Sequence, residues 1–155
     1  MAVFKLQLED FSTTEYELIA IHTTIEVTKL AFLLNKNLQT RFHFLDSIDK
    51  TEKKEKGSFE RYFFNDEEND VLWNLLENKS VIKAENNSTS LFDQFGQAMS
   101  LIPEFKSADY ILKIETEDSV LDINEIVTTI SSINTISLSY VMDKNKIKTK
   151  SNLIF

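Results

Sequence analysis

The sequence predicts an α+β fold in which two helices pack on one face of a mostly antiparallel sheet. Apolar and polar residues alternate in several short runs, as they do in half-buried strands. Two other segments repeat apolar residues with the spacing of an amphipathic helix. The 155 residues, of which 42% are apolar and 27% charged, suit an ordinary core, so we expect a single domain over residues 1–155.

The first expected elements are two strands. Apolar residues alternate over residues 3–8, which predicts a half-buried strand. Residues 16–21 (YELIAI) are more continuously apolar, as in a strand that is covered on both faces. The second of these strands opens a strand–helix–strand unit at residues 16–45.

A helix follows within this unit. Thr23 and Glu26 have the spacing of a capping box, in which each side chain satisfies a free backbone N–H. Residues 35–37 are expected to end the helix, and residues 40–45 to form a strand with both Phe side chains on one face. The buried stripe of the helix is expected to consist of Val27, Leu30, Ala31 and Leu34.

An antiparallel meander is predicted over residues 59–84. The charged residues 46–58 (DSIDKTEKKEKGS) are expected to form a linker before it. A turn is expected at residues 78–80, and residues 91–100 fit a short helix or an irregular strand equally well. The three strands of the meander are expected at residues 59–64, 71–76 and 81–84.

The only proline, Pro103, marks a corner in the chain. It fixes its own φ and biases Ile102 towards extended geometry. Asp109 then opens a strand, which begins a second strand–helix–strand unit at residues 109–142. Two such units around a meander favour a fold built from ferredoxin-like strand–helix–strand units.

The helix of the second unit has its own boundary signals. Asp122 and Glu125 form a second capping box, beside a hydrophobic staple between Leu121 and Ile126, and Asn134 is expected to close the helix. The buried stripe is expected to consist of Ile123, Ile126, Val127 and Ile130. The last strand should then have an apolar face made of Ile136, Leu138, Tyr140 and Met142.

The segment around the proline also resembles a known family. Ile102-Pro103-Glu104 is followed by Ala108-Asp109-Tyr110, and Leu33-Leu34-Asn35-Lys36 and Asn152-Leu153-Ile154-Phe155 support the match. On these residues the chain resembles the IPExxVDY family of the Bacteroidota, which is named for its motif. Ala108 stands where that family has valine, and three residues rather than two separate it from Glu104. The family has no assigned activity, so the resemblance implies no particular function.

The composition argues against several classes of function. Without cysteine the chain holds no disulfide, thiolate metal site or cysteine nucleophile. Its 2 glycines form neither a phosphate-binding loop nor a dinucleotide fingerprint. We see no catalytic motif and expect no cofactor. The sequence also has no signal-peptide pattern and no apolar run long enough for a membrane helix, so we expect a cytoplasmic protein that binds no membrane.

Charge is distributed unevenly along the chain. The net charge is −8, and the four Lys of residues 144–155 leave −12 for residues 1–143. Nucleic-acid binding is therefore expected only through this basic tail, because Lys and Arg at phosphates supply most of that affinity. If the tail is extended, the ammonium groups of its four lysines project from one side. They could bind an acidic partner or an RNA backbone, or they could protect a sheet edge from aggregation. They belong to Lys144, Lys146, Lys148 and Lys150, and the apolar end at Leu153, Ile154 and Phe155 is expected to dock on the body.

The most specific polar cluster lies beside Pro103 and consists of Glu104, Asp109 and Tyr110. One interpretation is a small recognition site at the entry of a strand. The other is architectural: Glu104 satisfies backbone donors, Asp109 caps the corner and Tyr110 packs inward. We weight the architectural interpretation more heavily.

The remaining candidates are metal ligands. His22 and His43 could hold a metal only if they met across the sheet beside a carboxylate, and no short ligand spacing supports this. The acidic loop at residues 65–70 lacks the glycine and the terminal Glu of an EF-hand. We therefore expect histidines without a metal and a solvated hairpin tip.

Three hypotheses for function follow. The first is a non-enzymatic interaction or regulatory domain with a protein partner, which the missing catalytic motifs favour. The second is a ribosome- or RNA-associated factor that uses the basic tail. The third is a small-ligand-binding regulator or an enzyme with a site near Glu104, Asp109 and Tyr110.

Overall fold

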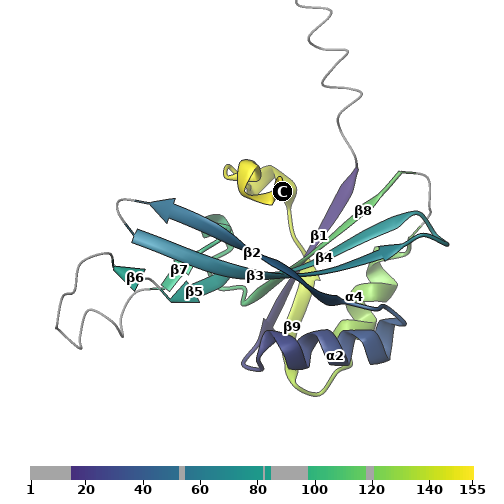
Figure 1. The fold of residues 1–155 in the computed structure, drawn as a ribbon. Coiled ribbons are helices and arrows are strands. Elements are labelled where there is room, and N and C mark those ends of the chain that lie inside the picture. Colours follow the sequence, from purple (N-terminus) through teal and green to yellow (C-terminus); the bar gives the residue numbers. More distant parts are fainter. Residues whose placement is uncertain (1–14, 53–54, 82, 85–97, 118–120) are drawn as a thin grey trace, which may run out of the picture.

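Strand β1 (Tyr16–Thr23) lies inside the sheet, and Leu18 to Ile21 on it are completely buried, as predicted for a strand that is covered on both faces. The computed structural model describes residues 15–52, 55–81, 83–84, 98–117 and 121–155 (Figure 1). The strand predicted over residues 3–8 lies outside the described residues.

Six strands form the main sheet in the order β2-β3-β4-β8-β1-β9, and each neighbouring pair is antiparallel. The short strand β6 (Lys83–Ala84) adds to β3, while β5 (Lys79–Val81) pairs with β7 (Ala98–Ser100) in a separate two-stranded sheet. Two helices complete the fold, α2 (Val27–Leu38) and α4 (Ile123–Ser131). The other bounds are β2 (His43–Glu52), β3 (Glu55–Asp66), β4 (Val71–Glu77), β8 (Tyr110–Thr116) and β9 (Ile136–Val141).

The sheet separates two hydrophobic clusters. Both helices lie on one face, below the sheet in Figure 1, and cover the first cluster. The C-terminal tail, residues 142–155, lies on the other face and covers the second cluster. The predicted α+β fold, with a mostly antiparallel sheet and two helices, is confirmed.

The helix α2 has the predicted buried stripe, since Val27, Leu30, Ala31 and Leu34 are all buried. The predicted capping box is wrong, because β1 continues to Thr23 and the helix begins after Glu26, whose side chain makes no capping hydrogen bond. The hydroxyl of Thr23 instead donates to the carbonyl of Thr135 at 2.8 Å, which joins β1 to the start of β9.

The predicted charged linker at residues 46–58 is wrong, because β2 and β3 form a long hairpin there. β2 lies at the edge of the sheet, where one side of a strand faces solvent and charged side chains protect it. Two hydrogen bonds of 2.7 Å join the guanidinium of Arg61 to the carboxylate of Asp46 across the hairpin. Phe59 on β3 pairs with Ile48 on β2, and the side chain of Phe59 is completely buried.

The start of β2 also differs from the prediction. Phe42 is buried in the core before the strand begins, whereas Phe44 is exposed. The pairing with β3 shifts between Phe44 and Asp46, so one alternating pattern does not describe this segment.

The predicted turn at residues 78–80 is wrong as well, because β5 begins at Lys79. Asn78 before it is completely buried, and its amide nitrogen donates to the carbonyls of Phe105 and Ala108 at 2.9 Å. Its Oδ1 accepts the N–H of Ile102 at 2.8 Å. One side chain therefore fixes the corner around the proline. Of the ambiguous residues 91–100, the described part is strand β7.

The second unit follows the prediction in part: of the expected stripe on α4, Ile130 is buried, and Ile123, Ile126 and Val127 are partly buried against the first cluster. The carboxylate of Asp122 accepts the N–H of Glu125 at 3.1 Å and begins α4, which ends at Ser131. The predicted face of β9 is wrong at Leu138, which is 51% exposed, while Ser139 is buried. Thr23 pairs with Ile136 and the preceding residue, His22, pairs with Leu138, so β9 has one extra residue, Ser137, at this point. The extra residue reverses which side chains of β9 face the core.

No helix in the described ranges is long and apolar enough to cross a membrane.

Candidate functional site

Glu104 contacts the C-terminal tail. It lies in a short 3-10 helix, η1 (Pro103–Phe105). Its Oε1 accepts the N–H groups of Lys148 at 2.8 Å and Thr149 at 3.0 Å, and its Oε2 accepts the hydroxyl of Thr149 at 2.9 Å. Desolvation raises the pKa of Glu104, but these bonds and its own backbone N–H outweigh it, so the pKa lies below its ordinary value.

Asp109 and Tyr110 contact other parts of the fold. The carboxylate of Asp109 accepts the N–H of Thr23 and the ammonium group of Lys79, both at 2.9 Å. The hydroxyl of Tyr110 donates to the carbonyl of Ile25 at 2.7 Å. Across the described residues no hydrogen bond joins Glu104 to Asp109 or Tyr110, so the three side chains do not form one site.

The two histidines do not meet. His22 lies on β1, where its Nε2 is 3.1 Å from the hydroxyl of Tyr140. His43 lies on β2, and three strands separate β1 from β2 in the sheet. Among the residues that the structure describes, no three His, Asp or Glu side chains could together hold a metal ion. In the acidic loop, Asp66 accepts hydrogen bonds from Asn69 and closes a turn.

The tail is not extended, and two short 3-10 helices, η2 (Lys144–Lys146) and η3 (Lys150–Leu153), shape it. Ile147 and Leu153 are buried against the sheet, whereas Ile154 is 80% exposed. The ammonium group of Lys144 donates to the carbonyl of Tyr16 at 2.7 Å. The side chains of the other three tail lysines face solvent.

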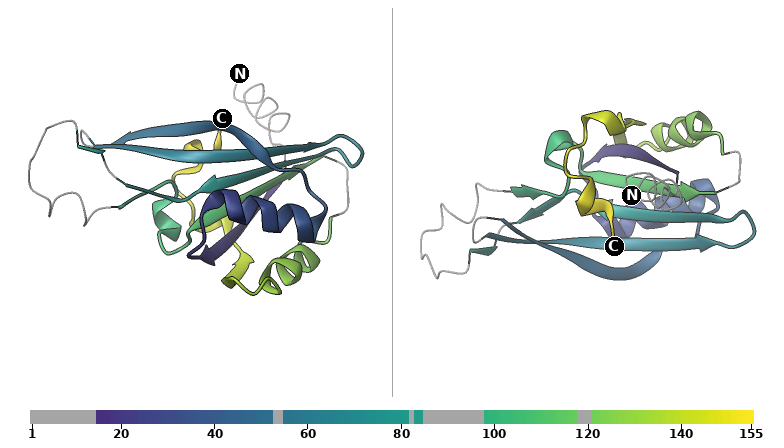
Figure 2. Two further views of the ribbon diagram at one scale, coloured as in Figure 1. Left: turned by 60° about the horizontal axis from the view of Figure 1, so that its bottom comes forward. Right: turned by 90° about the horizontal axis from the view of Figure 1, so that it is seen from above.

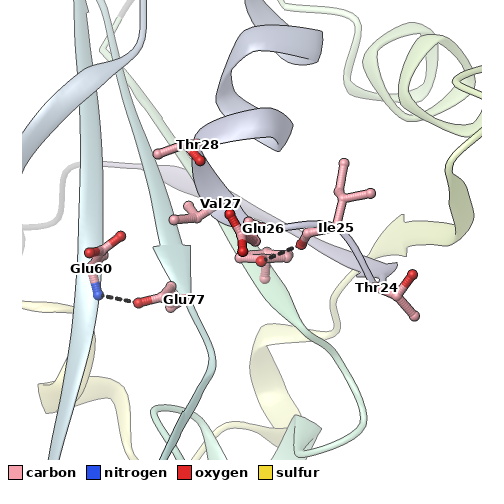
Figure 3. Close-up of a pocket in the computed structure, with 8 residues that line it drawn as sticks. Thr24, Ile25, Glu26, Val27, Thr28, Glu60 and Glu77 are labelled. Carbon is pink, nitrogen blue, oxygen red and sulfur yellow. Dashed lines mark hydrogen bonds between the residues drawn. The ribbon is translucent and has the colours of Figure 1, made fainter.

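One pocket lies at the start of α2 and has a volume of about 470 Å³. Figure 3 shows Glu26 at the start of the helix and Glu60 and Glu77 on neighbouring strands. The N–H of Glu60 donates to the Oε1 of Glu77 at 2.7 Å. Burial raises the pKa of Glu77, and burial together with nearby carboxylates raises the pKa of Tyr110 to about 12. These acidic walls disfavour an anion, and the Tyr110 hydroxyl is already bonded to the loop before α2.

A second pocket, of about 580 Å³, lies between the sheet and the end of the tail, and we call it the tail-face pocket. Figure 2 (right) shows the tail crossing this face from β1 towards β3. Its polar and charged lining residues are Tyr16, Arg61, Asn74, Lys113, Glu115 and Lys150, and Phe63, Leu72, Leu153, Ile154 and Phe155 supply its apolar surface.

Two cations shape this pocket. Lys113 is only 7% exposed, forms an ion pair with Glu115, and donates to the carbonyl of Leu153 at 2.9 Å. The Phe155 ring lies 5.0 Å from the ammonium group of Lys113 and 4.6 Å from the guanidinium of Arg61. Cation–π contact with both groups therefore joins the last residue to strands β3 and β8.

Asn74 is the least satisfied residue of the pocket. It lies on β4, is only 4% exposed, and its Oδ1 is buried without a hydrogen-bond partner. A buried acceptor without a donor costs about 1–3 kcal/mol. Sequence reasoning missed this residue, although the one polar residue in the apolar run VLWNLL was a usable signal.

No family model matches the chain, and no curated protein has a significant sequence match to it. The tail-face pocket combines a buried cation with aromatic rings, which suits the binding of a small molecule that has both polar and apolar surface.

Proposed function

We propose that the chain is a non-enzymatic regulatory domain that binds a small molecule in the tail-face pocket. The observation that carries this proposal is a pocket of about 580 Å³ in which the almost completely buried Lys113 lies 5.1 Å from the ring of Tyr16 and 5.0 Å from the ring of Phe155. Ligand pockets commonly combine an apolar lining with a few placed polar groups in this way.

The contacts of the charged lining residues support binding rather than catalysis. Arg61 is bonded to Asp46, and Lys113 is paired with Glu115. Groups held in ion pairs orient and attract a ligand but are poorly placed to exchange protons with it.

The position of the tail supports a regulatory role. Leu153 and Phe155 form one wall of the pocket, and Glu104 binds the same tail at Lys148 and Thr149. A ligand in the pocket therefore changes how firmly the tail is held, and a protein partner that contacts the tail would detect the difference.

A thermal-shift screen of a metabolite library tests this function. A ligand present at 100 times its dissociation constant should stabilise the native protein by about 2.7 kcal/mol. Phe155→Ala should lose most of the shift, because it removes one wall of the pocket, and the matched variant Phe32→Ala, on the exposed face of α2, should keep it. A library that leaves the melting temperature of the wild type unchanged, or an equal shift in Phe155→Ala, would count against the proposal.

Ribosome or RNA binding is a second candidate. The observation in its favour is that the side chains of Lys146, Lys148 and Lys150 face solvent on an otherwise acidic protein. Binding through these groups should weaken steeply with salt. Triple replacement of these lysines by Gln should abolish co-sedimentation with ribosomes, and unchanged co-sedimentation would exclude this candidate.

We also propose membership of the IPExxVDY family and a cytoplasmic location. The contacts of Glu104 and Asp109 support membership of the family, because they give motif residues a role in joining distant parts of the fold. The absence of cysteine from the sequence supports a cytoplasmic location. The segment β8-α4-β9 supports one ferredoxin-like unit, because β8 and β9 flank β1, whereas in β1-α2-β2 three strands separate β1 from β2.

A further inference from the structure

The two edge strands of the main sheet differ in charge. β2 and β9 end the order of strands, and across the described residues no strand pairs with the outer side of either. Charged side chains keep an edge strand from pairing with another chain, and β2 carries four of them, on Asp46, Asp49, Lys50 and Glu52. β9 (ISLSYV) carries none. One edge of the sheet is therefore protected and the other is not.

The surface around β9 is also almost free of charge. Glu125 is the only charged residue in the sequence from residue 123, at the start of α4, to residue 142, after β9, although 27% of the whole chain is charged. On this surface Leu138 is 51% exposed and Val141 is 40% exposed. The core of an interface between protein copies is apolar and depleted of charge, so this surface has the composition of an interface.

The backbone of β9 can bond to a further strand on its outer side. At the end of the strand the N–H of Met142 donates to the carbonyl of Leu18 on β1 at 2.8 Å. In an antiparallel pair every second residue of a strand turns its backbone groups to the same side. The N–H and C=O groups of Ser139 and Val141 therefore point away from β1, towards the open edge.

The sequence of β9 is complementary to itself in an antiparallel pair. With Ser139 at the centre of such a pair, Leu138 lies opposite the partner's Tyr140. Asp143, the first charged residue after the strand, lies opposite the partner's Thr135 and so meets no second acid. Pairs of aromatic and aliphatic side chains across two strands stabilise a sheet, whereas like charges destabilise it. A second copy of this chain, related by a two-fold axis, therefore fits this edge.

We propose that two copies of this chain dimerise through β9, so that their main sheets continue as one antiparallel sheet. Each chain has a net charge of −8, and the uncharged edge is where two such chains approach each other with the least repulsion. The tail-face pocket is lined by other strands and by the tail, so each copy keeps its own pocket in the dimer. This inference does not depend on the proposed function.

Sedimentation equilibrium of the full chain tests the dimer. The wild type should reach twice the 18.0 kDa mass of one chain as its concentration rises. Leu138→Lys should raise the dissociation constant of the dimer at least about tenfold, because this apolar side chain lies in the interface twice. The matched variant Leu45→Lys, at a side chain that is 45% exposed on β2, should leave the dissociation constant unchanged. A wild type that stays monomeric, or a Leu45→Lys variant that dissociates as readily as Leu138→Lys, would overturn the proposal.

Amide hydrogen exchange locates the contact without relying on the stability of a variant. The amides of Ser139 and Val141 should exchange more slowly in concentrated wild-type protein than in dilute protein, because pairing with the second copy protects them. The amides of β2 should exchange equally at both concentrations. Protection that rises with concentration only outside β9 would place the interface elsewhere. Protection of Ser139 and Val141 that is equally strong in dilute protein would mean that another part of the same chain covers the edge. Either result would overturn the proposal.

Discussion

Asn74 and Asn78 lie four residues apart, and both are buried, but their amides differ in what they bind. The amide of Asn78 makes three hydrogen bonds, to Ile102, Phe105 and Ala108. The Oδ1 of Asn74 makes none. A buried polar atom stabilises a fold only when it is bonded, so the two residues should respond in opposite ways to the same substitution.

We therefore expect Asn74→Leu to leave stability unchanged or to raise the free energy of unfolding by about 1–3 kcal/mol. Asn78→Leu should lower it by about 3 kcal/mol, because it leaves the N–H of Ile102 and the carbonyl of Ala108 without partners in the corner around Pro103, while the carbonyl of Phe105 keeps the N–H of Ala108. Urea denaturation of the two variants and the wild type measures both effects. A similar loss in both variants would show that the amide of Asn74 has a partner in solution.

At the scale of single residues the sequence predicted apolar stripes better than polar contacts. The buried residues of α2 follow from a 3.6-residue period that involves only near neighbours. The partners of Asn78 lie 24 to 30 residues away, and those of Glu104 lie 44 and 45 residues away. No local pattern contains that information, so Asn74 and Asn78 could not be distinguished before the structure was known.

The tail is held in part by Glu104, whose carboxylate accepts three hydrogen bonds from Lys148 and Thr149. The pKa of Glu104 is lower in the native protein than its ordinary value. Its charged form therefore stabilises the docked tail fully above the ordinary glutamate pKa of about 4.3, and this contribution is lost as the pH falls through the lower native value. The tail should loosen in acid before the sheet unfolds.

Hydrogen exchange at the amides of Lys148 and Thr149 measures this effect. Protection, corrected for the intrinsic exchange rate, should fall between about pH 5 and pH 3 in the wild type. In Glu104→Gln, which keeps an acceptor but cannot titrate, protection should be lower and independent of pH in this range. A fall in protection of equal size in both proteins would assign the effect to other carboxylates.

At the scale of elements, errors in prediction arose where the sheet has an edge or an irregularity. The hairpin of β2 and β3 was expected to be a linker because edge strands carry many charged residues, which local composition cannot distinguish from a loop. Leu138 was placed on the wrong face because one extra residue in the pairing of β1 with β9 reverses the alternation. The interior strands β1, β4 and β8 were predicted well, because burial on both faces makes their sequences strongly apolar.

For the whole molecule, the tail is part of the core rather than an appendage. Ile147 and Leu153 are buried in the second cluster, on the face of the sheet without helices. A chain that ends at Asp143 should lose about 3–6 kcal/mol of unfolding free energy, because it exposes the surface that these two side chains cover. Chemical denaturation measures the loss. As a control, Ile154→Ser should change stability by less than about 0.5 kcal/mol, since Ile154 is mostly exposed. Equal stability of the shortened and full chains would contradict the docked tail.

The overall arrangement was predictable only in outline. The helices and the antiparallel meander indicated an α+β fold, but the order of the strands depends on pairings between distant segments such as β1 with β8 and β4 with β8. The tail-face pocket arises from residues on β1, β3, β4, β8 and the tail together. A site built from five separate segments has no local motif.

The central claim is that a small molecule binds between the sheet and the tail. The most direct test records amide NMR spectra of the wild type and of Phe155→Ala with the small-molecule fraction of a lysate of the source cells. We expect shifts at Asn74, Lys113 and Leu153 in the wild type and clearly smaller shifts in the variant. Identical spectra with and without the fraction, or the same shifts in both proteins, would contradict the claim.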